Sequence, residues 1–445
     1  MVLGGGIAGL LAARVLSEVY PEVTVVDRDD LADTLAPRRG VPQGHHIHAL
    51  MARGQLALEE LFPGLTADLV ARGVPLIDPA GQARVFASGH HLMPADSGIH
   101  VLSASRPCLE GYLRGRVGSS PGVTFADQRD VVGLVTTADR RRVIGARVVR
   151  RADGSSEEAL EADLVVDATG RGSRAPRWLG ALGYEPPAEE RISAGVGYAS
   201  GLFRLPDGAL GRDLAILHAP SPARPRGAGL AMLEGGLSIV TLLGMRGDHP
   251  PVDRAGFLSF ARSLQYPDVH EAVRDADILR EPVPHRFPAS VRHRYERLRS
   301  LPDGLVVLGD AVCSFNPIYG QGMTVAALEA LALRRHLAAR AGAVATRELM
   351  RDLARAVDVP WDMAAGGDLA YPGVVGRRTP RVRLANAYLP RLHAAASSDS
   401  SLTVAFLRVA GMLDPPQTLF RPGVVARVLR GSRNGTSGRS VAGPK

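Results

Sequence analysis

Three glycines close to the N-terminus have the spacing of a phosphate-binding turn, Gly4-x-Gly6-x-x-Gly9. The first glycine of such a turn permits the bend, the second lets the backbone approach a pyrophosphate, and the third lets the next helix pack closely. The helix N-terminus then offers free N–H groups to the phosphates. Asp27 follows at the spacing of a carboxylate that accepts ribose hydroxyls. This pattern indicates a dinucleotide site for FAD or NAD, while Arg28 leaves NADP open.

A second carboxylate and a second glycine-rich loop occur near residue 310. Residues 304–308 read as a buried parallel strand, and Asp310 follows that strand. The loop over 316–323 opens a helix expected over 322–340, whose N-terminal dipole would stabilise an anion. A reduced flavin carries such an anion on its pyrimidine ring. Two helix N-termini of this kind favour one cofactor with two ends.

Hydrophobic periodicity predicts the elements that position these two turns. A strand over 2–3, a helix over 7–19 and a strand over 23–26 make a βαβ unit, with further strands over 162–168 and 304–308. Residues 191–285 alternate at period two, which predicts an antiparallel sheet, and residues 346–430 are helical. The predicted fold class is α/β: a Rossmann-like domain with an inserted antiparallel-sheet substrate domain and a helical C-terminal extension.

Composition excludes several classes of protein. The chain has 53 Lys and Arg against 45 Asp and Glu, a net charge of +8, and 45% hydrophobic residues. The positive charge is scattered and almost entirely arginine, since the only lysine is Lys445. This distribution lacks the basic runs of a nucleic-acid-binding protein, and the hydrophobic content excludes a wholly disordered chain. Chemistry that needs a lysine is close to excluded.

The cysteines and apolar stretches predict a cytoplasmic protein without a membrane span. Cys108 and Cys313 make neither a disulfide framework nor a zinc motif, and we interpret Cys313 as a packed residue rather than a redox thiol. The apolar N-terminus lacks the basic region of a signal peptide. The later apolar stretch 227–245 is interrupted at Glu234-Gly235-Gly236, which indicates a hairpin.

A histidine cluster precedes the first long helix. His45, His46 and His48 have no acid or further histidine placed to complete a metal site, so no metal is expected. They read as loop histidines, with a flavin contact by one of them left open.

Three segments together resemble the flavoprotein monooxygenase family related to 4-hydroxybenzoate hydroxylase. They are GGGIAG…VVDRD, DLVVDATGRGSR and GLVVLGDAVCSFNPIYGQGMTVAALEAL, and the resemblance covers most of residues 1–345 in order and spacing. Within that family, residues 38–48 and the helix start at Ser105-Arg106-Pro107 are closest in pattern to FAD-dependent epoxidases that act on polyene precursors of polyether antibiotics.

The resemblance implies FAD as cofactor, with NADPH or NADH as a transient reductant and O2 as co-substrate. In this family the reduced flavin forms a C4a-hydroperoxide whose distal oxygen is electrophilic, so the protein positions the substrate and excludes water. The cofactor-binding residues that it implies are Gly4, Gly6, Ala8, Gly9, Asp27, Arg28, Arg38, Arg106, Val131, Asp167, Asp310, Pro317, Gly320, Gln321, Gly322 and Met323.

Within this set the resemblance implies separate roles along the cofactor. Gly6 and Ala8 would lie at the pyrophosphate, Arg38 and Arg106 near the phosphates, and the Val131 backbone at the adenine. Asp310 would bind the ribityl chain, and residues 320–323 would lie under the flavin ring. Thr169 stands where phenol hydroxylases carry an Asp before the glycine, which leaves the mode of NAD(P)H engagement open.

The domain limits expected from these patterns divide the chain into alternating parts. The FAD-binding domain takes 1–84, 106–190 and 286–345, the substrate-binding strands 85–105 and 191–285, the C-terminal helical region 346–431, and a flexible tail 432–445.

The leading functional hypothesis is a monooxygenase of antibiotic biosynthesis that epoxidises an alkene in an apolar small molecule: a polyene, terpenoid or polyketide. Hydroxylation of an aromatic phenol or polyketide is the alternative. Apolar residues of the predicted sheet are expected to wall the substrate pocket, namely Leu230, Met232, Ile239, Thr241 and Leu243. No acid–base residue is assigned, and the oligomeric state is open.

Three other functions compete with this hypothesis. A flavin-dependent reductase of isoprenoid double bonds shares the scaffold. Tryptophan-type halogenases need a lysine and a Trp-x-Trp-x-Ile motif, whereas here Trp178 and Trp361 are isolated and Lys445 is terminal. A flavin-binding sensor would need a docking patch that the sequence does not show.

Overall fold

The computed structural model describes residues 1–32, 36–152 and 154–434. Five short strands form a parallel sheet in the order β19-β11-β1-β2-β7. They are β1 (Val2–Leu3), β2 (Val23–Val26), β7 (Val123–Ala126), β11 (Val165–Asp167) and β19 (Leu305–Val307). Valine and leucine predominate in them because both faces of a parallel sheet are covered. The sheet confirms the Rossmann-like α/β architecture predicted from the sequence.

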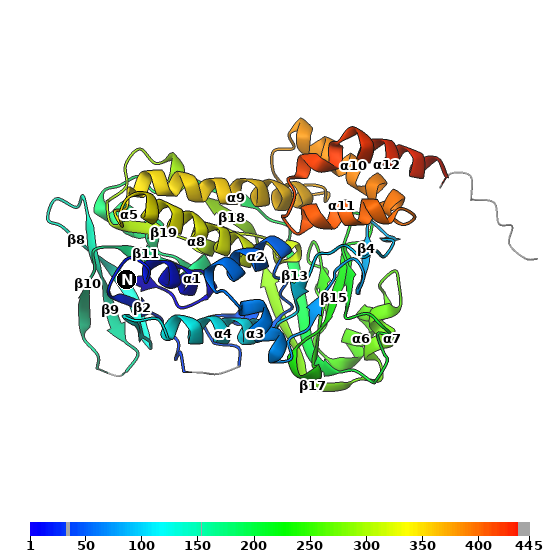
Figure 1. Ribbon diagram of the computed structural model, residues 1–445, viewed down its shortest axis with the longest axis horizontal. Coiled ribbons are helices and arrows are strands. Elements are labelled where there is room, and N and C mark those ends of the chain that lie inside the picture. Colours follow the sequence, from blue (N-terminus) through cyan, green and yellow to red (C-terminus); the bar gives the residue numbers. More distant parts are fainter. Residues whose placement is uncertain (33–35, 153, 435–445) are drawn as a thin grey trace, which may run out of the picture.

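Helices α1 (Ile7–Leu16), α4 (Arg106–Gly118) and α8 (Gly322–Ala339) cover this sheet, with α1 packed against both α4 and α8 (Figure 1). Helix α1 ends at Leu16 rather than at the predicted residue 19. The Gly4 turn follows β1 and Asp310 follows β19, so both lie at carboxyl ends of parallel strands. Such ends meet at one edge of a sheet, where ligands of open α/β folds bind.

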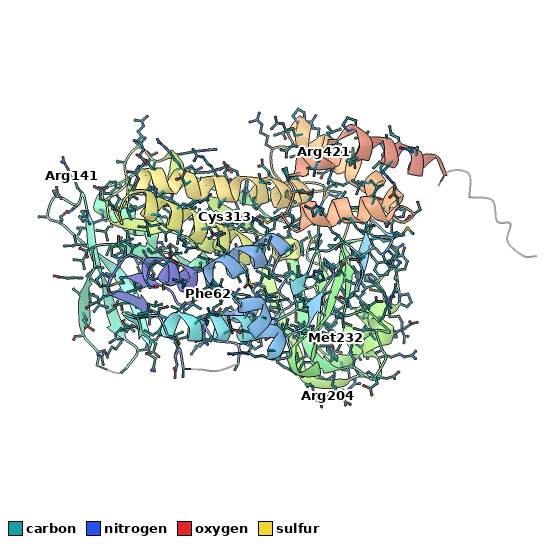
Figure 2. All side chains as sticks on the ribbon, viewed as in Figure 1. Phe62, Arg141, Arg204, Met232, Cys313 and Arg421 are labelled. Carbon is teal, nitrogen blue, oxygen red and sulfur yellow. The ribbon has the colours of Figure 1, made fainter. Side chains whose placement is uncertain are left out.

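Smaller elements surround the parallel sheet. They are α2 (Ala52–Leu61), α3 (Leu65–Ala71), β3 (Leu76–Ile77), β6 (Val101–Leu102), β8 (Arg129–Thr136), β9 (Val143–Arg150), β10 (Glu157–Glu161), α5 (Ala175–Leu182), β12 (Glu189–Ile192), β18 (Ser290–His293) and β20 (Cys313–Ser314). Strands β8, β9 and β10 make an antiparallel sheet of their own. Figure 2 shows Arg141, between β8 and β9, at the outer tip of that sheet.

A seven-stranded sheet forms the second layer of the molecule, in the order β17-β13-β16-β15-β14-β4-β5. Its strands are β17 (Asp277–Phe287), β13 (Val196–Arg204), β16 (Ser238–Gly244), β15 (Arg226–Met232), β14 (Ala215–His218), β4 (Ala83–Ala87) and β5 (His90–His91). All neighbours are antiparallel except β4 and β14. The sheet confirms the antiparallel insertion predicted from period-two alternation.

The strand limits differ from the predicted segment limits. β4 begins before residue 85, β17 continues to Phe287, and β6 pairs with β3 outside the seven-stranded sheet. Strand pairing therefore places 101–102 apart from the other substrate-domain strands. The division of the chain into domains stays a prediction.

Helices cover both faces of the seven-stranded sheet. On one face α6 (Arg254–Arg262) and α7 (Asp268–Val273) enclose a core that contains Leu230, Val240 and Leu242. The other face is covered by α10 (Pro380–Ala396), α11 (Ser400–Ala410) and α12 (Pro422–Asn434), which enclose Ile239 and Ala231 (Figure 1). Residues of alternate parity thus reach different cores, as a strand requires.

The C-terminal region is helical, as predicted. Helix α9 (Thr346–Asp368) lies along α8, and α10 to α12 form a separate layer over the sheet (Figure 1). Helix α12 ends at Asn434, and most of the predicted tail, residues 435–445, lies outside the described part. Within the described ranges no helix has both the length and the hydropathy needed to cross a membrane.

Candidate active site

Each glycine of the Gly4 turn has a distinct local geometry. Gly4 has φ +99°, a conformation that favours glycine. A Cβ at Gly9 would lie 1.7 Å from the Gly4 carbonyl oxygen, so only glycine lets α1 pack this closely. A Cβ at Gly6 would have no atom within 4 Å, which leaves open space beside the first turn of α1. Because Gly6 caps α1 without a side-chain hydrogen bond, the N–H groups of that turn are available to an anion.

A buried arginine lies next to this turn among three carboxylates. Arg38 contacts Asp27 Oδ1 at 3.3 Å, Asp29 Oδ2 at 3.2 Å and Glu110 Oε1 at 2.5 Å. It also donates to the Gly5 carbonyl oxygen at 3.2 Å. Asp27 Oδ2 in turn accepts the Gly5 N–H at 2.5 Å, so the carboxylate and the turn are held together. The guanidinium compensates negative charge that burial would otherwise make costly.

Arg106 connects this cluster to the second carboxylate of the site. Its Nε donates to Glu110 Oε2 at 3.0 Å. Burial alone would raise the pKa of Glu110, but Arg106 and Arg38 hold that pKa below its ordinary value. Burial raises the pKa of Asp310, and the positive charges of Arg106 and Arg171 oppose the increase. Arg106 is thus bonded to the cluster at the Gly4 turn and lies close enough to Asp310 to lower its pKa.

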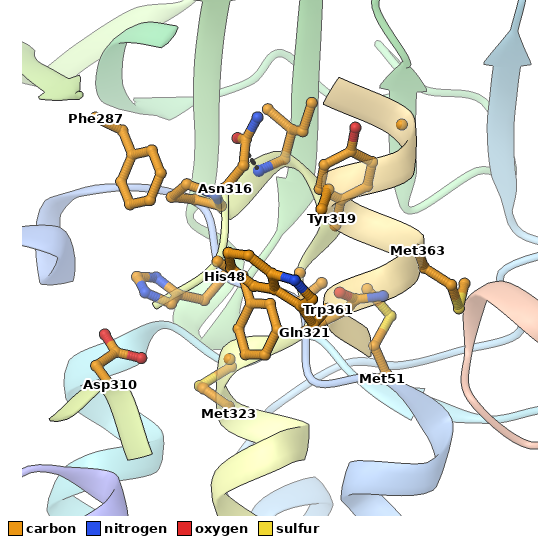
Figure 3. Close-up of a pocket in the computed structure, with 18 of the residues that line it drawn as sticks. His48, Met51, Phe287, Asp310, Asn316, Tyr319, Gln321, Met323, Trp361 and Met363 are labelled. Atoms are coloured by element: carbon orange, nitrogen blue, oxygen red, sulfur yellow. Dashed lines mark hydrogen bonds between the residues drawn. The ribbon is translucent and has the colours of Figure 1, made fainter. Parts of the chain in front are cut away.

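The second glycine-rich loop ends in a left-handed turn at Gly320 (φ +65°), where a Cβ would lie 2.3 Å from Met51 Cε. Helix α8 starts two residues later with no acidic side chain in its first turn. The buried Gln321 Oε1 has no hydrogen-bond partner within the described ranges. Figure 3 shows Gln321 and Met323 around the same hollow as His48 and Asp310. The loop therefore presents a helix N-terminus and an unpaired amide oxygen to one space.

A network behind this loop fixes its shape. Asn316 Nδ2 donates to Asp368 Oδ1 at 2.8 Å, and the Tyr319 hydroxyl donates to the same oxygen at 3.1 Å. Tyr198 of β13 donates to Asn316 Oδ1 at 3.3 Å. Burial raises the pKa of Asp368 to about 6, although the bonds from Asn316 and Tyr319 lower it. The loop is thus tied to both the seven-stranded sheet and α9.

One continuous cavity of about 2360 Å³ joins the Gly4 turn to the Gly320 loop. Most of the predicted site residues line it: Gly4, Gly6, Ala8, Asp27, Arg28, Arg38, Arg106, Val131, Asp310, Pro317, Gly320, Gln321, Gly322, Met323, Thr241 and Leu243. The cavity thus places residues from the two ends of a 320-residue segment around one space.

Two predicted cofactor residues do not line the cavity. Gly9 lies behind the turn against Gly4. Asp167 is fully buried, where its Oδ1 accepts from the Thr169 hydroxyl and its Oδ2 accepts from the Ser173 hydroxyl, both at 2.6 Å. Burial raises the pKa of Asp167. In this structure Asp167 shapes the turn after β11 and does not reach the cavity.

The structure also corrects the predicted pocket wall. Met232 and Leu230 pack with the core under α6 and α7, and Figure 2 shows Met232 away from the C-terminal helices. Ile239 is on the opposite face but is enclosed by the C-terminal helices. The reason is register: Leu230 pairs with Val240, so it cannot share a face with Thr241.

Histidines that the sequence analysis interpreted as loop residues line the cavity. His46 Nδ1 lies 2.7 Å from Ser200 Oγ, which lies 2.6 Å from Thr241 Oγ1. Burial and neighbouring His285 lower the pKa of His46 to about 3. Burial and Arg106 lower the pKa of His48 to about 4. Both imidazoles are therefore neutral at physiological pH. The clustering of these histidines in the sequence indicated a shared site, but the partners of His46, Ser200 and His285, lie far away in the sequence.

Within residues 1–32, 36–152 and 154–434, no three His, Cys, Asp or Glu side chains are placed to hold a metal ion.

Comparisons with known proteins give one relative of substantial identity. Protein Rv3254 of Mycobacterium tuberculosis is 37% identical over 429 residues, which cover 93% of this chain and 89% of the relative. Kynurenine 3-monooxygenase of Salinispora arenicola is 29% identical over 376 residues, 79% of this chain and 75% of that protein. No protein-family model matches the chain.

Solved structures share the fold at lower identity. The flavin-dependent brominase Bmp2 superposes with a TM-score of 0.69 at 13% identity, covering 98% of both chains. The p-nitrophenol 4-monooxygenase PnpA of Pseudomonas putida DLL-E4 superposes with a TM-score of 0.65 at 18% identity, covering 93% of this chain and 98% of that chain. The architecture is therefore that of flavin-dependent monooxygenases and halogenases.

Proposed function

This chain belongs to the family of Protein Rv3254. From the geometry of its cavity we propose that it is an FAD-dependent monooxygenase. The observation that carries the proposal is the single cavity lined by both the Gly4 turn and the Gly320 loop. One turn suits a diphosphate and the other suits the anionic end of a ring system. A two-ended cofactor fits that pairing better than two separate ligands do.

The residues present fit FAD. The open space beside Gly6 is a cradle that a side chain would fill, and it lies at the N-terminus of α1. Asp27 would meet the adenosine ribose, with Arg106 near the phosphates and Asp310 at the ribityl chain. The unpaired Gln321 Oε1 would accept a hydrogen bond from the ring edge. Asp27 already accepts the Gly5 and Asp29 N–H groups, so it is held in place before the ribose arrives.

Bound and reduced, FAD would activate O2, which gives one oxygen atom to the substrate and the other to water. The chain's own residues would bind the cofactor, orient the substrate and exclude water. Thr241 and Leu243 of β16 form the wall beyond the loop, and Trp361 of α9 lines the same space (Figure 3). The Ser200 hydroxyl holds the neutral His46 ring in place, so the ring can donate or accept a hydrogen bond without adding charge to the cavity.

NADPH or NADH is the proposed reductant, bound transiently to the same cavity. No second glycine turn with a following acid occurs in the sequence, which supports a shared site. Thr169 lines the cavity at the place where phenol hydroxylases carry an Asp. Arg171 and Arg174 also line it and could hold phosphate groups of the donor.

Alkene epoxidation of an apolar substrate is the proposed reaction. Epoxidation needs no substrate deprotonation, whereas ortho-hydroxylation of a phenol benefits from a base beside the ring. His46 and His48 are weak bases, with pKa values of about 3 and about 4. The low basicity of these cavity imidazoles favours an alkene over a phenol.

Aromatic hydroxylation is the second candidate. Two kynurenine 3-monooxygenases from Salinispora species are 29% identical to this chain, and each match covers 79% of it. Their names describe oxygen insertion by a related sequence, and this favours hydroxylation over reduction of a double bond.

The experiment is reconstitution and turnover. We expect the purified protein to be yellow, or to become so with FAD, and to oxidise NADPH or NADH faster when an alkene substrate is present. With ¹⁸O2 the product should carry one labelled oxygen. A protein that cannot be loaded with FAD would refute the proposal, and a reduced product without label would instead identify a reductase.

A further inference from the structure

The cavity has a second arm between the seven-stranded sheet and the C-terminal helices. Thr241, Gly229, Leu217 and Val85 all line it. They are direct register neighbours on β16, β15, β14 and β4, so they form one row across the sheet. Adjacent strands lie about 4.8 Å apart, so the row spans about 14 Å. It begins beside the histidine segment, because Ile47 N–H donates to Thr241 Oγ1 at 3.1 Å.

Helices α10 and α11 roof this arm. Arg381, Ala385, Leu389 and His393 line the cavity at four-residue intervals and so share one side of α10, with Arg381 in its first turn and His393 in its last. Phe406 and Ala410 do the same on α11. The lining residues contributed by β4, β14, β15, α11 and residues 385–396 include no Asp, Glu, Lys or Arg. Arg381 is twelve residues from His393, about 18 Å along the helix, so a charged ligand group beside His393 would lose its hydration without gaining an ionic partner.

Two polar side chains meet at the far side of the arm. Ser88 lies in the turn after β4, and its Oγ is 2.9 Å from His393 Nδ1 of α10. Both residues line the cavity. The His393 ring meets the Phe406 ring edge-on, with ring centroids 4.6 Å apart. His393 is 7% exposed, and its Nε2 has no partner in the described part of the chain.

The chemistry of this pair limits the group that can satisfy it. Burial and neighbouring His90 lower the pKa of His393 to about 4, so the ring is neutral at pH 7. If Ser88 donates to Nδ1, the Nε2–H donates to an oxygen; in the other tautomer Nε2 accepts from a hydroxyl. An alcohol satisfies both tautomers. A hydrocarbon end would leave Nε2 unpaired, and a carboxylate would be desolvated without a cation.

Resting on the proposed function, we propose that Ser88 and His393 are the specificity-determining anchor for the distal end of the substrate. The substrate class is then an elongated apolar alkene that ends in an alcohol. The alkene lies toward the Gly320 loop and the hydroxyl lies between β4 and α10, along the row from Thr241 to Val85.

The test uses three probes with the same apolar chain: all-trans-farnesol, β-farnesene and farnesoate. Their binding to FAD-loaded protein is measured by calorimetry, without turnover. In the wild type farnesol should bind at least tenfold more tightly than farnesoate. His393→Phe should lower the affinity for farnesol at least fivefold and leave the affinity for farnesene within about twofold of wild type, because only the alcohol loses its hydrogen bond. His393→Gln, which keeps a donor and an acceptor, should recover most of the loss.

His218→Phe is the matched control. His218 also lines the cavity and is buried with an unpaired Nε2 and with a pKa lowered to about 4 by burial. Its ring, however, is tilted against Phe86 at 4.3 Å and meets Tyr266 edge-on at 5.9 Å, in the core under α6 and α7. It should leave the affinity for farnesol unchanged. The anchor is overturned if His393→Phe lowers the affinities for farnesol and farnesene equally, or lowers neither. It is also overturned if His218→Phe causes the selective loss of farnesol affinity, or if farnesoate binds the wild type as tightly as farnesol does.

Failure of the anchor is distinguishable from failure of the proposed function. A yellow enzyme with substrate-stimulated NADPH oxidation but no selective effect at His393 would contradict the anchor alone. A protein that never takes up FAD would contradict the proposed function before any probe is titrated.

Discussion

Glu329 Oε2 accepts a hydrogen bond from the backbone N–H of Gly309 at 2.7 Å. Glu329 lies on α8 and Gly309 lies in the turn that presents Asp310, so the bond ties together the two ends of the glycine-rich loop. Glu329 is fully buried, and its Oε1 has no partner within the described ranges. Burial raises its pKa to about 8, with the Gly309 N–H opposing and Asp310 adding to the increase.

This pKa has a consequence for stability. The folded state holds the Glu329 proton up to pH about 8, whereas the unfolded chain releases it near the ordinary value of 4.5. Stability from this group is therefore complete below pH 4.5 and declines as pH rises toward 8. Calorimetry gives the melting temperature of Glu329→Gln minus that of the wild type, and we expect this difference to be larger at pH 8.5 than at pH 5.5. Equal differences at the two pH values would contradict the raised pKa of Glu329.

The glycines of the first turn separate binding from folding. Gly6→Ala points a methyl group into open space, so the apoprotein should melt within about 2 °C of wild type. FAD should bind at least tenfold more weakly, about 1.4 kcal/mol, because that space is the phosphate cradle. Gly9→Ala is the matched variant: its Cβ meets the Gly4 carbonyl, and it should destabilise the apoprotein by about 3 kcal/mol. Fluorescence titration and melting curves measure both; a destabilised Gly6→Ala apoprotein would be the opposite result.

Arg38 compensates buried carboxylates. Arg38→Met should reduce the free energy of unfolding by about 3–5 kcal/mol at pH 7, since Asp27, Asp29 and Glu110 lose their shared cation. Arg106 and Arg38 lower the pKa of Glu110, so the stability that this group contributes is complete above pH about 4.5 and is lost as pH falls below that value. The loss of stability in Arg38→Met should therefore be smaller at pH about 3.5 than at pH 7.

The control for Arg38 is Arg151→Met. Arg151 pairs with Asp130 on the surface, where its side chain is 37% exposed. Its removal should change the free energy of unfolding far less than removal of Arg38 does, at either pH. Urea denaturation of both variants makes the comparison, and similar losses in the two would mean that the buried cluster is not held by Arg38.

Thr241 fixes the histidine segment on the sheet. Thr241→Val removes the oxygen that accepts the Ile47 N–H and that contacts Ser200. We expect amide exchange at Ile47 to accelerate at least tenfold, because its partner is gone. Thr241→Ser keeps that oxygen and should leave the exchange rate near wild type. Unchanged exchange in Thr241→Val, read by mass spectrometry, would show that another group holds the segment.

Local patterns predicted the parts of the site that local chemistry determines. Gly4, Gly9 and Asp310 follow short buried strands, and strand-then-turn signals are readable from adjacent residues. The parallel sheet follows from those same strands. The sequence predicted the Arg38 cluster only in part. A phosphate role was inferred for Arg38, whereas its contact to Asp29 depends on a pairing across nine residues and its contact to Glu110 on a pairing across 72 residues.

Long-range register explains what the sequence did not predict. Whether Met232 or Leu243 faces the cavity depends on how β15 pairs with β16, and the hairpin turn at Glu234–Gly236 sets that pairing. The roof formed by α10 and α11 depends on packing between residues near 400 and strands near 85. The pairing of His46 with Ser200 likewise joins segments that no local signal connects.

The most direct measurement is diffraction from crystals grown with FAD. Continuous electron density should run from the Gly4 turn, with the adenosine near Asp27, to a ring system resting at the Gly320 loop. Density confined to one turn, or a ring system bound elsewhere, would contradict the account of one cofactor spanning the cavity.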